Sequence, residues 1–85
     1  ITVKNGNCIG YVVPGLIRTE QVYGDKVELN FRVTKPMKNK KLVVKMNGDV
    51  IKSINKLAVI PSEMESIMID KELLKDGELS VEVED

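Results

Sequence analysis

Two stretches of the chain, residues 26–33 and 78–84, alternate polar and apolar side chains without interruption. This period of two is typical of a β-strand with one buried and one solvent-exposed face. In the first stretch the pattern predicts four inward-pointing side chains: Val27, Leu29, Phe31 and Val33. The chain is therefore predicted to be all-β, with half-exposed sheets.

Shorter β-rich runs bounded by turn residues predict further strands. We expect these strands at residues 1–4, 8–13, 41–46, 49–54 and 57–60. Leu16 and Ile17 are expected to resume pairing at a sheet edge, and residues 34–40 to form a polar connection. Seven to eight strands with turns about every eight to twelve residues are typical of an immunoglobulin-like antiparallel β-sandwich. The Cys…Trp…Cys framework of antibody domains is absent, so the prediction concerns architecture alone.

Asn47-Gly48 is the strongest short hairpin signal in the sequence. A two-residue turn would pair Met46 with Asp49. A three-residue loop would pair Lys45 with Asp49, setting opposite charges together, and would place two valines on one face. We favour the three-residue loop.

The segment from Ser62 to Lys75 allows two interpretations. Ser62 to Glu65 fits a helix capping box, and the apolar residues that follow have helical spacing. Residues 65–70 are, however, β-rich and bounded by turn formers. We favour a strand at 65–70 and a helical turn at 71–75.

The bulk composition describes one ordinary globular domain, residues 1–85. Hydrophobic residues make up 42% of the chain and charged residues 31%, and 13 basic residues balance 13 acidic ones. The balanced charge favours neither a nucleic-acid nor a membrane partner. The chain begins at Ile1 rather than Met, and we expect a piece of a longer protein rather than a protein processed at its start.

Chemistry-bearing residues are sparse. The sequence has no His and no Trp, so the commonest general base and a base-stacking platform are both missing. Cys8 is the single cysteine, and a buried structural role is favoured over a reactive thiol. No catalytic, cofactor-binding or metal-binding residue is predicted in this chain.

Charged clusters are expected to be solvated surface. The basic stretch contains Arg32, Lys35, Lys38, Lys40, Lys41 and Lys45. We expect these charges to disfavour edge-to-edge pairing of sheets rather than to bind phosphate. The carboxylates of residues 63–85 lack the order of a calcium loop. Among the methionines, Met46 and Met68 are expected in the core, whereas Met37 and Met64 are candidates for a docking surface.

Four segments carry a resemblance to a known family: Tyr11-Val12-Val13-Pro14 followed by Arg18, then Val27 to Pro36, then Asn47 to Ile51, and Val59 to Glu65. In that order and spacing the chain resembles the small C-terminal domain of a family of FAD- and NAD(P)-dependent oxidoreductases. These are described as similar to anaerobic glycerol-3-phosphate dehydrogenase or to pyridine nucleotide-disulfide oxidoreductases. The resemblance covers residues 3–83.

The resemblance implies a non-catalytic accessory domain in a cytoplasmic protein, with FAD and NAD(P) held by flavoprotein domains upstream. The domain would pack on that catalytic body or form a homo-oligomer surface. The candidate docking residues are Arg18, Met37, Ser62, Met64 and Glu65. The alternative is an immunoglobulin-like binding module of a cell-surface protein.

Overall fold

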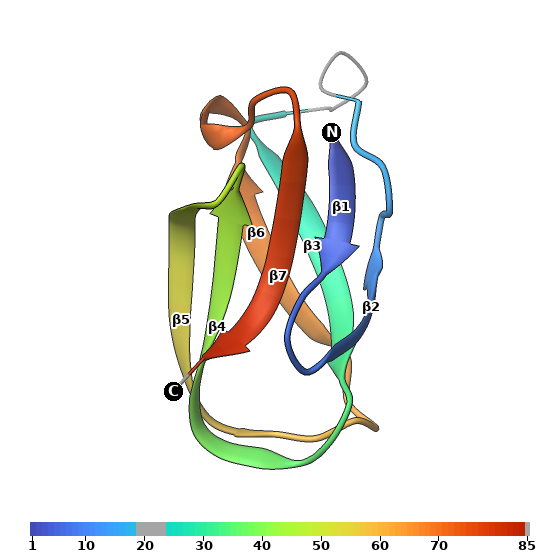
Figure 1. Cartoon of the computed structure of the whole chain (residues 1–85), viewed down its shortest axis with the longest axis vertical. Coiled ribbons are helices and arrows are strands. Elements are labelled where there is room, and N and C mark those ends of the chain that lie inside the picture. The colour runs from blue at the N-terminus through green and yellow to red at the C-terminus, as the bar shows by residue number, and fades with distance from the viewer. Residues whose placement is uncertain (19–23, 85) are drawn as a thin grey trace.

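The computed structural model describes residues 1–18 and 24–84, and this part of the chain forms two packed β-sheets (Figure 1). The four-stranded sheet has the order β1-β7-β4-β5 and the three-stranded sheet the order β2-β3-β6. The strands are β1 (Thr2–Asn5), β2 (Ile9–Val13), β3 (Lys26–Val33), β4 (Met37–Met46), β5 (Asp49–Val59), β6 (Glu65–Asp70) and β7 (Glu78–Glu84). A short 3-10 helix, η2 (Lys71–Leu73), precedes β7. The predicted all-β sandwich is confirmed.

The core lies between the inner faces of the two sheets. The inward residues predicted for β3 are all buried. They form one cluster with Ile67 and Ile69 of β6, and with alternate residues of β4 and β7 from the facing sheet. Period-two alternation and burial therefore coincide in these strands.

The strand pairs are antiparallel except β1 with β7, which run parallel, with Thr2 beside Glu78. This strand order differs from the ABED and CFG sheets of immunoglobulin constant domains. Because β1 and β7 run in the same direction, the start of β1 and the end of β7 lie at opposite ends of the molecule (Figure 1). Leu16 bridges to Thr2, which confirms the expected edge pairing.

The β4–β5 hairpin is longer than predicted. Residues 34–40 were expected to form a connection, but β4 begins at Met37, and residues 49–59 form one strand instead of two. Lysine-rich sequence can still pair because the ladder uses backbone groups while the side chains remain solvated. Asn39 has a φ of 53° within β4. At this bend the alternation of buried and exposed side chains along β4 changes, because Met37 and Lys40 are three positions apart and both are half-buried.

The favoured hairpin register is wrong, and the two-residue turn is present. Met46 pairs with Asp49 and Lys45 with Val50. Asn47 and Gly48 have φ values of 51° and 90°, which match a type I′ turn. The register then shifts by one residue, because Val44 pairs with Lys52.

The ambiguous segment is resolved in favour of the strand. Glu65 to Asp70 forms β6, which pairs with β3. The helical turn expected after it is the 3-10 helix η2. Side chains of β6 alternate between the core and the solvent, so the strand prediction is confirmed.

Candidate functional site

The outer face of the three-stranded sheet carries a cluster of side chains from β2, β3 and β6. We call this surface the Tyr11–Arg32 face, and it comprises Tyr11, Val13, Asn30, Arg32, Ser66 and Met68. The register sets Tyr11 beside Arg32, and Val13 beside Asn30, which in turn lies beside Ser66. These neighbours therefore form rows across the sheet.

A bulge in β2 sends Tyr11 to this outer face. Ile9 pairs with Val33 and Tyr11 pairs with the adjacent residue Arg32, so Gly10 is the extra residue. In a regular strand Ile9 and Tyr11 would share a face, because residues two apart point the same way. The bulge instead buries Ile9 and leaves Tyr11 44% exposed.

Arg32 ties three elements together on this face. Its Nε donates a hydrogen bond to Tyr11 Oη at 3.1 Å, and its Nη1 donates to the carbonyl oxygen of Pro61 at 3.2 Å. Pro61 lies in the connection between β5 and β6. The planar guanidinium makes both contacts at once, so two other elements hold the Arg32 side chain in place.

A second polar row continues across the sheet. Ser66 Oγ donates to Asn30 Oδ1 at 2.6 Å, and Asn30 Nδ2 donates to Glu28 Oε1 at 3.1 Å. Beside these rows, Val13 and Met68 remain exposed. Tyr, Met and Arg are residue types enriched in protein interfaces, so we take this face as the candidate docking surface.

The structure separates the predicted docking residues. Ser62 and Met64 are exposed in the β5–β6 connection, close in sequence to the Pro61 carbonyl that Arg32 binds. Arg18 follows β2 at the opposite end of the sandwich. Glu65 is 8% exposed and forms an ion pair with Lys56 at 3.2 Å, so it belongs to the interior of the fold.

The methionine predictions are partly wrong. Met46 is buried in the core as expected, but Met68 points outward from β6 and is exposed. Met37 is half-buried and packs against the core. Strict alternation along β6 could have placed Met68 outside, because Ile67 and Ile69 occupy the inner face.

Sequence reasoning missed Tyr11, Asn30 and Arg32 as site residues. The alternation of residues 26–33 was the available signal, since it already placed Arg32 and Asn30 on the wet face. The contact with Tyr11 depends on the β2 bulge, which local periodicity does not reveal.

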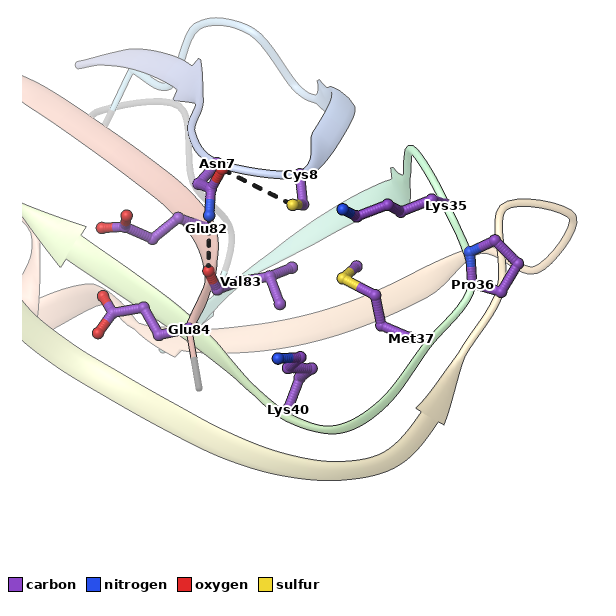
Figure 2. A pocket seen from close by; sticks show the side chains of 9 residues that line it. All are labelled: Asn7, Cys8, Lys35, Pro36, Met37, Lys40, Glu82, Val83 and Glu84. Atoms are coloured by element: carbon purple, nitrogen blue, oxygen red, sulfur yellow. Dashed lines mark hydrogen bonds between the residues drawn. The ribbon is translucent and has the colours of Figure 1, made fainter.

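A hollow opens at the end of the sandwich where β7 finishes (Figure 2). Its walls come from Asn7 and Cys8, from residues 35–37 and Lys40, and from residues 82–84. Figure 2 shows Lys35 and Met37 directed into it. Lysines and glutamates both line this hollow, so its surface has no single sign of charge.

Cys8 lies on the wall of the hollow, not in the core. It is half-buried, has a φ of 63°, and its Sγ lies 3.7 Å from Asn7 Oδ1. The predicted full burial is therefore wrong, but the side chain does pack against the edge of the core. The turn that carries Cys8 is held by backbone hydrogen bonds to β7, which bring the thiol to the rim of the sandwich.

The basic stretch does not form one patch. Arg32 lies on the outer face of the three-stranded sheet, whereas Lys45 belongs to the other sheet. Lys45 Nζ lies 2.7 Å from Glu82 Oε1 and 3.2 Å from Glu84 Oε2. The hydrogen bond that Lys45 donates to Glu82, followed by the one that it donates to Glu84, raises the pKa of Lys45 above its ordinary value.

No protein-family model, curated protein or solved structure matches the chain. Within residues 1–18 and 24–84, no group of three or more His, Cys, Asp or Glu side chains is placed to hold a metal ion. The same residues include no helix long and apolar enough to cross a membrane. The resemblance to the oxidoreductase C-terminal domain stays a prediction.

Proposed function

We propose that this chain is a non-catalytic accessory domain of a cytoplasmic oxidoreductase that uses flavin and nicotinamide. In this proposal the domain packs on the catalytic body, and FAD and NAD(P) are bound by domains upstream of it. Support for the class comes from the four sequence segments that resemble the family. Support for a docking role comes from the Tyr11–Arg32 face.

The observation that carries the docking proposal is the pair of hydrogen bonds made by Arg32. They hold an arginine and a tyrosine together on one surface. Arg32 Nε lies 3.1 Å from Tyr11 Oη, and Arg32 Nη1 lies 3.2 Å from the Pro61 carbonyl oxygen. Fixing these side chains in the free domain lowers the entropy lost on binding. Exposed Val13 and Met68 would supply apolar contact area beside them.

The oxidoreductase class is tested by the visible absorption spectrum of the natural full-length protein, purified without oxygen. Flavin bands that bleach when NADH or NADPH is added would support the class. A colourless protein that stays colourless after FAD is supplied would contradict it. Supplying FAD separates a true absence from loss during purification.

The alternative function is a binding module in an array on a cell-surface protein. One structural observation favours it: the start of β1 and the end of β7 lie at opposite ends of the sandwich (Figure 1). Such an arrangement allows modules to follow one another in a line. In that case the natural protein would be colourless and would contain further β-domains.

In the other form of the accessory role, the domain provides a surface for homo-oligomer formation. If the Tyr11–Arg32 face binds a second copy, the isolated domain would be a dimer by light scattering. Arg32→Ala would then return it to the monomer.

A further inference from the structure

We propose that the free edge of β5 binds an extended acidic segment of a partner protein, which adds a strand to the four-stranded sheet. This site is separate from the Tyr11–Arg32 face and does not depend on the proposed function. Strand addition is a common mode of peptide recognition, in which backbone hydrogen bonds give affinity and side chains give specificity.

The first argument is the length and exposure of the edge. β5 has 11 residues, about twice the usual length of a strand. β4 lies on one side of it, and no other described strand pairs with it. Val50 and Leu57 are 58% and 83% exposed on this strand. A long edge with exposed apolar side chains is a template for another strand.

The second argument is the charge beside the edge. Lys52 and Lys56 of β5 both reach toward the neighbouring edge of β6: Lys52 Nζ donates to the carbonyl oxygen of Met68 at 2.6 Å, and Lys56 forms the ion pair with Glu65. Within the described residues Lys52 has a neutral carbonyl as its partner and no carboxylate within ion-pair distance. A partner carboxylate would therefore give Lys52 the charged partner that it lacks.

The spacing of the two lysines defines the segment. Residues four apart in a strand share a face and lie about 13 Å apart. An added strand with carboxylates four positions apart would present both to Lys52 and Lys56. Lys56 already has Glu65, so we expect Lys52 to contribute more of the affinity.

The chain itself shows that an acidic strand can pair with this hairpin. β7 alternates glutamates with apolar residues and pairs with β4, where Lys45 binds Glu82 and Glu84. The proposed segment would use similar chemistry on the other side of the hairpin, beside β5.

The same lysines disfavour a second copy of this chain as the occupant. An antiparallel pairing of two β5 strands centred on Ile54 would set Lys52 opposite Lys56 twice. Like charges directly opposite one another destabilise a strand pair. In this register the two lysines disfavour self-association, whereas they would attract an acidic strand.

The test uses a capped, extended peptide of Thr and Val that carries two Glu residues four positions apart. The control peptide has Gln at both positions. Titration into the isotope-labelled domain is followed by amide NMR shifts and by amide hydrogen exchange. We expect the Glu peptide to bind and to slow exchange at alternate amides of β5. We expect much weaker binding of the Gln peptide, and weaker binding of the Glu peptide at high salt.

Lys52→Gln keeps a hydrogen-bond donor for the Met68 carbonyl, so the fold should persist, as a thermal melt would verify. It should weaken binding of the Glu peptide about two- to fivefold, the loss typical of one partly exposed ion pair. Lys26→Gln, on the other sheet, is the matched control and should leave binding unchanged. The proposal is overturned if the Glu peptide fails to bind, binds without protecting β5 amides, or binds equally to the Lys52→Gln variant.

Discussion

Lys45 Nζ and Glu82 Oε1 lie 2.7 Å apart on the outer face of the four-stranded sheet, and this contact joins β4 to β7. The register places Val43 opposite Glu82, so the ion pair runs diagonally across the two strands. Val43 shares this outer face and is nevertheless 4% exposed. We attribute its burial to the long side chains around it, whose apolar stems can cover a neighbouring valine.

The raised pKa of Lys45 predicts a change of stability at alkaline pH. Because the folded pKa lies above the ordinary value of 10.5, the ion pair contributes its full stabilisation below that pH. The contribution is lost as the pH rises through the folded pKa. The free energy of unfolding should therefore fall more steeply above pH 10.5 in the wild type than in Lys45→Gln.

Urea unfolding at a series of pH values checks this prediction. The comparison isolates Lys45, because the two proteins share every other side chain. Identical slopes in the two proteins would show that Lys45 does not carry the effect.

Gly6 is predicted to be required for the turn between β1 and β2. A Cβ at this position would lie 2.8 Å from Glu82 Cβ and 3.0 Å from the Val81 carbonyl oxygen. Gly6→Ala must therefore push the turn away from β7, and we expect a loss of about 1–3 kcal/mol in the free energy of unfolding. Gly15→Ala is the control, since its Cβ would have no neighbour within 4 Å. Equal stability of the two variants would refute the close approach.

Asn47 is predicted to join the β4–β5 turn to the turn that precedes β7. Its Nδ2 donates to the Asp76 carbonyl at 3.1 Å, and its Oδ1 accepts from the Glu78 amide at 2.9 Å. Asn47→Gly keeps the positive φ but removes both contacts, and should cost about 1–2 kcal/mol by thermal or urea unfolding.

A double-mutant cycle tests the Asn47 contacts more sharply. A Cβ on Gly77 would overlap the Asn47 side-chain amide. Gly77→Ala should therefore cost less stability in the Asn47→Gly background than in the wild type. Purely additive losses would mean that the two residues do not interact.

The Lys56–Glu65 pair is predicted to matter because Glu65 is nearly buried. Lys56→Met would leave the carboxylate without its cation and should cost about 1–2 kcal/mol, since the pair is partly exposed. Adding Glu65→Leu should recover most of that loss by replacing the pair with apolar contacts. Chemical denaturation of both variants measures the recovery. A double variant no more stable than Lys56→Met would contradict this role for the pair.

The sequence predicted those parts of the fold in which burial follows a local period. β3 and β7 alternate strictly, so these strands and the inward side chains Leu29 and Phe31 could be assigned, whereas the strand at 65–70 was favoured for its β-rich composition. The start of β4 could not be assigned, because its lysine-rich sequence has no periodic apolar residues. The strand there depends on backbone pairing with β5.

The predictions of the hairpin register and of the candidate site failed for a related reason. Lys45 was assigned to Asp49, its nearest acid along the chain, but it binds Glu82 on a strand distant in sequence. The contacts of Arg32 with Tyr11 and Pro61 likewise join three separate elements. Such contacts form between elements that are distant in sequence and neighbours in space, so local sequence patterns do not specify them.

The central claim is that the Tyr11–Arg32 face docks this domain on the catalytic body of its own protein. The most direct measurement is the affinity of the isolated domain for the remainder of the natural protein, by calorimetry, for the wild type, Arg32→Ala and Lys4→Gln. Lys4 is exposed on the other sheet and serves as the control. We predict that Arg32→Ala weakens binding by about 2 kcal/mol, or thirtyfold, while Lys4→Gln has no effect. Equal affinities for all three, or no binding by the wild type, would contradict the claim.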